Sequence, residues 1–370
     1  MQKPSKLAQI PQICFAGFTK PWERRKLGDC VDVQSGRDYK HLLEGNIPVY
    51  GTGGYMLSAN EALSYNQDAI GIGRKGTIDK PYILKAPFWT VDTLFYALPR
   101  ENNKLDFLNC IFQKINWKSK DESTGVPSLS KTIINSVDIH IPEETEQNKI
   151  GSYFQSLDKL ITLHQSKFEK LQKIKKSCLQ NLFPQNNQNT PKIRFKNFSD
   201  EWVERKADEI CTIETGKSNT QDQNDNGKYP FYIRSDKPVR SNKFLYDCEA
   251  VITIGDGSIG KVFHYVKGKF DLHQRCYKMT DFKDVTGKYF YYYFSTKFYD
   301  RTMKMTAKAT VDSVRLEMIS DMFFSIPNNL AEQCKISEFF TKLDKLILLQ
   351  QHKVEKLKNI KKALLNKMFI

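Results

Sequence analysis

Two stretches of the chain place mostly hydrophobic residues at alternating steps of four and three positions. The first stretch passes through Ile150, Phe154, Leu157, Ile161, His164, Phe168 and Leu171, and the second through Ile336, Phe340, Leu343, Ile347, Gln350, Val354 and Leu357. An average spacing near 3.5 residues is typical of a coiled-coil seam. Neither stretch contains Gly or Pro after Gly151, so each predicts a long helix of about 40 residues. We expect the seam residues to form the interface of a helix pair.

The two helical stretches are copies of each other. When residues 147–183 are aligned with residues 333–369, roughly 20 of the 37 positions are identical. A second pair of copies, residues 15–37 and 195–217, aligns without a gap and matches Trp22 to Trp202 and Gly36 to Gly216. We call these two shorter segments the frame segments. The chain is therefore predicted to be an internal repeat with approximate two-fold symmetry.

The segments between the copies, residues 38–124 and 218–308, differ strongly from each other. Both contain short β-type runs separated by Gly and Pro, which predicts compact α+β domains with mostly antiparallel sheets. A polar run closed by Pro191 predicts a linker. The expected organisation is a first α+β domain at 1–142, a long helix at 143–184, a linker at 185–192, a second α+β domain at 193–327 and a second long helix at 328–370.

The composition suggests a polyanionic partner. Among 370 residues, 57 Lys and Arg outnumber 42 Asp and Glu, which leaves a net charge of +15. Such a surplus favours nucleic acid over a membrane. A hydrophobic fraction of 40% excludes global disorder. No apolar run approaches the roughly 18 residues of a membrane span, so we expect a soluble, cytoplasmic protein.

Each half contains a G-x-G-x-x-G string, at residues 71–76 and 255–260. Neither is followed by helix-forming sequence, so we interpret both as glycine turns and not as dinucleotide sites. Basic and aromatic residues near these turns are the candidate DNA contacts, although any single one could be an ordinary surface charge. The candidates are Tyr50, Thr52, Tyr55, Arg74, Lys75 and Lys80 in the first half, and Arg234, Lys237, Arg240, Lys243, Lys261, Gln274 and Arg275 in the second.

Catalytic signatures are absent from the sequence. It contains no P-loop, no H-E-x-x-H pair and no G-x-S-x-G elbow. Its eight cysteines never form a C-x-x-C pair, and no cluster has metal-ligand spacing. We therefore predict no catalytic residue, no metal site and a binding function.

Taken together, these features resemble the specificity subunit of type I restriction–modification enzymes. The resemblance covers almost the whole chain and is strongest in the paired Leu-Asp-Lys-Leu-Ile helices at residues 157–161 and 343–347. It implies two α+β target-recognition domains separated by two long antiparallel coiled-coil helices, each domain reading one half of a split asymmetric site in double-stranded DNA. It further implies two modification subunits that carry S-adenosylmethionine and methylate adenine, and two restriction subunits that use ATP and Mg. No cofactor is expected on this chain.

Two other functions are compatible with parts of the sequence. A coiled-coil scaffold could bind nucleic acid without sequence preference through its basic face, although two different β-rich inserts on matched frame segments argue against it. A self-contained methyltransferase would need the cofactor and catalytic motifs that the sequence lacks.

Overall fold

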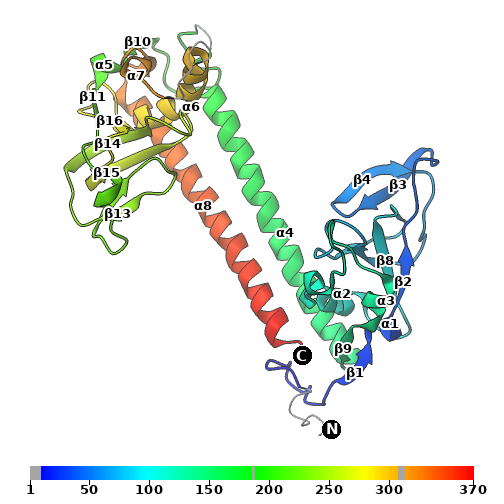
Figure 1. Ribbon diagram of the computed structural model, residues 1–370. Coiled ribbons are helices and arrows are strands. Elements are labelled where there is room, and N and C mark those ends of the chain that lie inside the picture. The colour runs from blue at the N-terminus through cyan, green and yellow to red at the C-terminus, as the bar shows by residue number, and fades with distance from the viewer. Residues whose placement is uncertain (1–9, 186–187, 307–312) are drawn as a thin grey trace. The chain divides into compact units, whose positions relative to one another are not determined.

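The computed structural model describes residues 10–185, 188–306 and 313–370. The chain divides into two compact units, of which unit 1 comprises Met1–Ser166 and Gln351–Ile370 and unit 2 comprises Lys167–Gln350 (Figure 1). Two helices, α4 (Glu144–Asn181) and α8 (Leu330–Lys367), each contribute to both units. Each has 38 residues, which confirms the two predicted long helices. Part of the predicted linker, residues 186–187, lies outside the described residues.

The described part of unit 1 contains three antiparallel or mixed sheets and, before α4, three short α-helices and a 3-10 helix at Trp117–Lys120. Its strands are β1 (Glu23–Lys26), β2 (Val31–Ser35), β3 (Glu44–Gly51), β4 (Gly54–Ala59), β5 (Ala69–Gly73), β6 (Tyr82–Leu84), β7 (Trp89–Thr90), β8 (Leu94–Pro99) and β9 (Asp138–Ile141). Its short helices are α1 (Leu27–Cys30), α2 (Leu105–Lys114) and α3 (Lys131–Ser136). The strand orders are β2-β8-β5-β6, β4-β3-β7 and β1-β9.

Unit 2 also places a strand pair and a larger sheet before its long helix, and two of its strands, β14 and β15, are long. Its strands are β10 (Trp202–Lys206), β11 (Thr212–Thr215), β12 (Tyr229–Tyr232), β13 (Val239–Ser241), β14 (Tyr246–Ile254), β15 (Phe263–Leu272), β16 (Cys276–Thr280) and β17 (Phe323–Pro327). Its helices before α8 are α5 (Ala207–Ile210), α6 (Gly287–Thr306) and α7 (Leu316–Ser320). Six strands form one sheet in the order β11-β16-β14-β15-β12-β13, and β10 pairs with β17. The predicted α+β class is thus confirmed in both units.

The core of unit 1 encloses the end of α8. Phe369 lies 5.8 Å from Trp22, 5.4 Å from Phe107 and 5.9 Å from Phe154, measured between ring centroids. Because Phe154 belongs to the first half of α4, the end of α8 packs against the beginning of α4. The two helices therefore run antiparallel in this unit.

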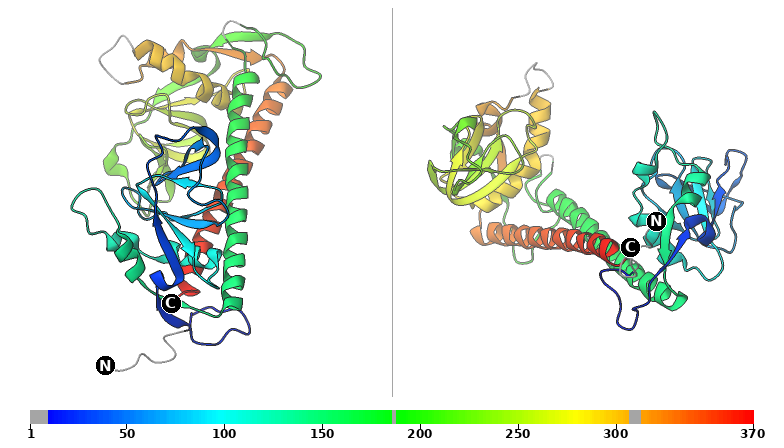
Figure 2. Two further views of the ribbon diagram at one scale, coloured as in Figure 1. Left: turned by 90° about the vertical axis from the view of Figure 1, so that its right-hand side faces the viewer. Right: turned by 60° about the horizontal axis from the view of Figure 1, so that its bottom comes forward.

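The core of unit 2 contains the reciprocal arrangement. Phe183, which follows α4, stacks on Phe340 of α8 with ring centroids 5.9 Å apart. In the sequence repeat, Phe183 aligns with Phe369, and Phe340 aligns with Phe154. Equivalent aromatic pairs therefore lie in both cores: in unit 1 the residue after α8 contacts α4, and in unit 2 the residue after α4 contacts α8. This symmetry confirms the predicted two-fold repeat. Figure 2 shows α4 and α8 as uninterrupted helices.

Candidate nucleic-acid interface

In unit 2, three loops meet at one end of the six-stranded sheet. The glycine turn after β14 donates a hydrogen bond from the Gly255 N–H to the Arg275 carbonyl at 2.7 Å. The loop between β15 and β16 is tied to β12 by a hydrogen bond from the His273 N–H to the Tyr232 carbonyl at 2.9 Å. Gly257 has a φ of +81°, a conformation that favours glycine, so the turn depends on this residue. These backbone contacts hold the side chains of the three loops at fixed relative positions.

Asp256 is the acceptor at the centre of this group. Its Oδ2 accepts hydrogen bonds from Nη1 of Arg275 at 2.8 Å and from Nη1 of Arg234 at 3.2 Å. The Asp256 side chain is 19% exposed, whereas those of Arg234 and Arg275 are 46% and 63% exposed. The carboxylate is therefore shielded beneath two guanidinium groups that face solvent. The sequence predicted both arginines but missed Asp256, although this residue lies within the glycine string.

His273 forms the buried wall of the same site. Its Nδ1 accepts the backbone N–H of Arg275 at 3.1 Å, and its Nε2 lies 3.5 Å from Oγ1 of Thr220. Burial lowers the pKa of His273, and the positive charges of Arg234 and Arg275 lower it further. The imidazole is therefore neutral at physiological pH and positions the loop that carries Arg275.

Unit 1 has the same backbone arrangement around its own glycine turn. The Arg74 N–H donates to the Thr93 carbonyl at 2.8 Å, and Gly76 has a φ of +86°. The Arg74 side chain is exposed, donates from Nη1 to the Asp92 carbonyl at 3.4 Å and lies 5.9 Å from the Phe95 ring centroid. Neighbouring Lys75 is also exposed. The two predicted basic residues therefore lie together at the tip of the turn.

The other predicted residues of unit 1 lie on or near the β3–β4 hairpin. Tyr50 and Tyr55 make an edge contact with ring centroids 6.4 Å apart, and Tyr55 is 62% exposed. Thr52 is half-buried in the turn between the strands, and Lys80 is exposed just before β6. Tyr55 thus presents an exposed ring on this hairpin.

Several predicted residues of unit 2 make contacts within the protein. Arg240 donates to the backbone carbonyls of Gly227 and Lys228 at 2.9 and 2.6 Å. Lys243 pairs with Asp222 at 2.8 Å. The ammonium group of Lys261 lies 5.4 Å from the Tyr299 ring centroid. The Arg240 guanidinium therefore stabilises the strand connection in the described structure, and the side chains of Lys237 and Gln274 are exposed.

The predicted seam residues all lie on inward or half-buried faces of α4 and α8. Those that are buried are Phe154, Leu157, Phe340, Leu343, Gln350 and Val354, and those that are half-buried are Ile161, His164, Phe168, Leu171, Ile347 and Leu357. Further ion pairs accompany the packing in each unit, such as Lys361 with Asp158 in unit 1 and Lys175 with Asp344 in unit 2, both at 2.5 Å.

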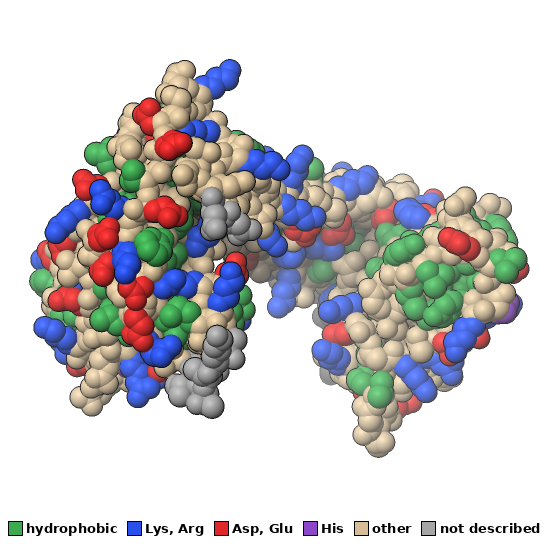
Figure 3. Space-filling model, turned by 90° about the horizontal axis from the view of Figure 1, so that it is seen from above, with side chains coloured by type: hydrophobic (Ala, Val, Ile, Leu, Met, Phe, Trp, Pro, Cys, Tyr) green, Lys and Arg blue, Asp and Glu red, His purple; other side chains and the backbone are tan. Residues whose placement is uncertain are grey.

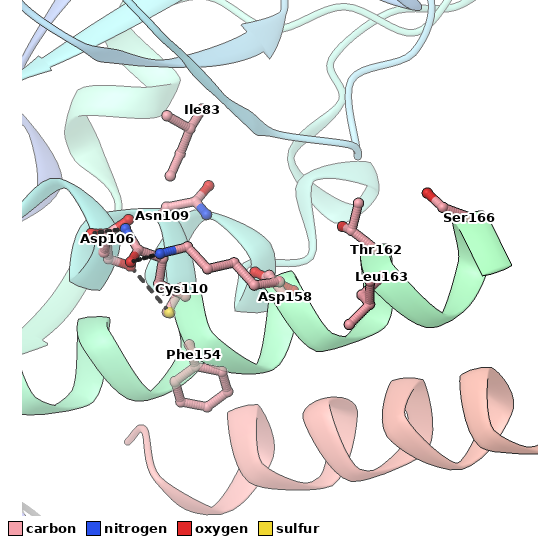
Figure 4. A pocket seen from close by; sticks show the side chains of 11 residues that line it. Ile83, Asp106, Asn109, Cys110, Phe154, Asp158, Thr162, Leu163 and Ser166 are labelled. Atoms are coloured by element: carbon pink, nitrogen blue, oxygen red, sulfur yellow. Dashed lines mark hydrogen bonds between the residues drawn. The ribbon is translucent and has the colours of Figure 1, made fainter.

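A separate groove of unit 1 lies between α2 and α4 (Figure 4). It encloses about 510 Å³ and includes Asn109, whose buried Oδ1 has no hydrogen-bond partner, and the exposed Leu163. Lys159 on α4 donates to Gln155 at 2.9 Å beside it. A groove of unit 2, of about 400 Å³, is lined by Thr341 and Lys345, the residues that align with Gln155 and Lys159 in the sequence repeat.

Charge is mixed on the visible surface, where Lys and Arg side chains lie among Asp and Glu side chains (Figure 3). Within the described residues, no group of three or more His, Cys, Asp or Glu side chains could hold a metal ion. In the same part of the chain, no helix is both long and apolar enough to cross a bilayer.

Comparison with known proteins gives consistent matches. The family model described as "Type I restriction modification DNA specificity domain" matches residues 19–175 and 199–359. The specificity subunit of the type I restriction enzyme MjaVIII from Methanocaldococcus jannaschii is 26% identical over 158 residues, which are 41% of this chain and 34% of that protein. The EcoDI specificity subunit from Escherichia coli is 26% identical over 147 residues, 40% of this chain and 31% of that protein. The alignments thus span about a third of the length of these curated relatives.

The fold also matches a solved structure. The crystal structure of a type I restriction–modification S subunit from M. genitalium superposes with a TM-score of 0.78 at 14% sequence identity, covering 98% of this chain and 99% of that one. At this identity the match establishes the common fold.

Proposed function

This chain belongs to the family of type I restriction–modification DNA specificity domains, which match it in two segments, and we propose that it is the recognition subunit of such a complex. In this role each recognition domain reads one half of a split, asymmetric site in double-stranded DNA. Two modification subunits would methylate adenine with S-adenosylmethionine, and two restriction subunits would use ATP and Mg to translocate and cleave. The chain itself would contribute recognition and no reacting group.

The proposal rests on the observation that the two units share the same backbone hydrogen bonds around their glycine turns but carry different side chains there. Backbone hydrogen bonds from Arg74 to Thr93 in unit 1 and from Gly255 to Arg275 in unit 2 join equivalent turns and loops. The side chains at these equivalent positions differ completely. Direct readout of a base sequence requires different side chains for different bases, whereas non-specific phosphate binding does not. Different side chains on the same backbone arrangement in the two units therefore support recognition of two different half-sites.

A repeated apolar stripe supports the proposal of two identical partner subunits. Leu160 and Leu163 of α4 are 47% and 62% exposed, and their counterparts Leu346 and Leu349 of α8 are both 48% exposed. Exposed leucines at matching positions of a repeat form two equivalent surfaces, as two copies of one partner require. The groove of Figure 4 adjoins this stripe, because Leu163 lines it.

The proposal is tested by sequencing the methylome of a host with and without the gene, expressed together with its partner subunits. We expect a bipartite methylated motif that appears only with this chain. Exchanging residues 38–124 for those of a relative should then change one half of the motif and leave the other unchanged. Loss of both halves in an assembled complex would contradict the proposed division of labour between the units.

A scaffold without sequence preference is the alternative function. Electrophoretic competition at about 150 mM salt separates the two, because a scaffold binds all duplexes alike under conditions that weaken phosphate contacts. A preference for the methylated motif over a scrambled duplex is expected for a recognition subunit. Equal competition by both duplexes would favour the scaffold.

A further inference from the structure

We propose that Arg275 reads a guanine in the half-site bound by the second recognition domain, and that Asp256 and Arg234 position it. This inference rests on the proposed function and specifies one recognised base and the side chain that contacts it. Among base edges of the major groove, guanine presents two acceptors, O6 and N7, and a guanidinium fills both with two parallel donors. Arg275 is 63% exposed at the end of a loop, so its guanidinium can enter a groove.

Asp256 restricts the orientation of this guanidinium. Among the guanidinium nitrogens of Arg275, only Nη1 donates to Oδ2 of Asp256, at 2.8 Å, so within the described structure Nη2 and Nε can still donate toward a base. Nη1 of Arg234 donates to both oxygens of the same carboxylate, at 3.2 Å to Oδ2 and 3.4 Å to Oδ1. An arginine fixed in this way loses less conformational entropy on binding than a free one.

The internal repeat shows that the fold does not need this ion cluster. In unit 1 the glycine turn makes a hydrogen bond from the Leu129 N–H to the Arg74 carbonyl at 2.9 Å, and in unit 2 the Val314 N–H bonds to the Gly255 carbonyl at 2.7 Å. By this register, Lys75 takes the place of Asp256 in unit 1. The same register puts Thr93 in the place of Arg275. Because the turn forms without an Arg–Asp–Arg cluster, the cluster serves a purpose particular to unit 2.

The carboxylate also favours a base over a phosphate as the ligand. Asp256 lies within 2.8 Å of the guanidinium and is 19% exposed. Asp256 offsets part of the charge of Arg275, so a phosphate anion gains less attraction here than at an unpaired arginine, whereas the two acceptors of a guanine still receive two directed donors. The site lies over a hollow of about 320 Å³ lined by Thr220, Ile233, Arg234, Asp256, Gly257 and His273.

The test compares the methylated motif and the duplex affinity of assembled complexes carrying Arg275→Ala, Arg275→Lys or Asp256→Asn. We expect all three to relax one guanine position in one half of the motif, with discrimination against other bases falling by about 5- to 150-fold. Arg275→Lys retains the charge but not the two parallel donors, so it should relax the same position. Arg205→Ala serves as the matched control, because this exposed arginine of β10 pairs with Glu209 outside the site.

Each other outcome has a definite meaning. Uniformly weaker binding with an unchanged motif would identify Arg275 as a phosphate contact and overturn the inference. An unchanged motif and affinity, or a wild-type motif without guanine, would overturn it as well. If the wild-type complex gives no bipartite motif at all, the proposed function itself fails, which is a distinguishable result.

Discussion

Arg194 donates two hydrogen bonds to Glu332, from Nε to Oε1 at 2.7 Å and from Nη2 to Oε2 at 2.8 Å. The glutamate side chain is 1% exposed and lies in the first turn of α8, while the arginine precedes β10. This bidentate pair therefore joins the residue just before the second frame segment to the first turn of α8.

Removing the arginine should destabilise unit 2. Arg194→Leu leaves an ionised carboxylate buried without a partner, which costs ~3–5 kcal/mol in comparable cases. Chemical denaturation followed by circular dichroism would measure the change in the free energy of unfolding. Arg205→Leu is the control, because its partner Glu209 is 51% exposed and the pair is 4.0 Å apart, so little change is expected. Equal losses in the two variants would contradict this account.

The equivalent glutamate of unit 1 should respond in the opposite direction. Glu146 is buried like Glu332, but the frame alignment puts Cys14 in the position of Arg194. Burial raises the pKa of Glu146, so its ionised form is less stable in the folded protein than in the unfolded chain. Glu146→Gln should therefore raise the thermal unfolding midpoint at pH 8, whereas Glu332→Gln should lower it.

The pH dependence provides a second check on this pair. A carboxyl whose pKa is raised on folding costs stability above its folded pKa, and the cost disappears below the unfolded pKa. The advantage of Glu146→Gln should consequently shrink as the pH is lowered toward about 5. A stabilisation that stays constant over this range would mean that ionisation of Glu146 is not its cause.

We expect Arg74 to be a DNA contact of unit 1. If its side chain reads a base, Arg74→Ala should weaken specific binding by about 1–3 kcal/mol and relax one position of the other half-site. Binding titrations and methylome sequencing of the assembled complex would detect both effects. Arg24→Ala is the control, since this arginine is 64% exposed and pairs with Asp138 away from the turn. If affinity and motif are unchanged, Arg74 is a solvent-exposed charge that does not contact DNA.

The repeated leucines should control the number of bound modification subunits. Leu160→Glu with Leu163→Glu in α4 should remove one partner copy, and Leu346→Glu with Leu349→Glu in α8 should remove the other, because a charge would be buried at the contact. Native mass spectrometry of the complex would count the copies. Leu348→Glu is a matched control, since Leu348 is 52% exposed but aligns with polar Thr162. Retention of both copies in the double variants would place the docking surface elsewhere.

The sequence alone determined the repeat, the two long helices and the α+β class of the recognition domains. These features are local or periodic: the four-and-three spacing around Phe154 and Phe340 is present before any folding occurs, and it selects a helix with one apolar face. The glycine turns could also be predicted from the sequence, because only glycine adopts a positive φ such as that of Gly257 at little conformational cost.

Only the tertiary structure decided which charged residues meet. Arg234, Asp256 and Arg275 come from three separate loops that long-range backbone hydrogen bonds bring together, and no local spacing predicts that convergence. Arg240 matched the same basic pattern as Arg234, yet its guanidinium donates to the carbonyls of Gly227 and Lys228. A side chain's charge is set by the sequence, but its partners depend on contacts between residues far apart in the chain, which are formed only when the chain folds.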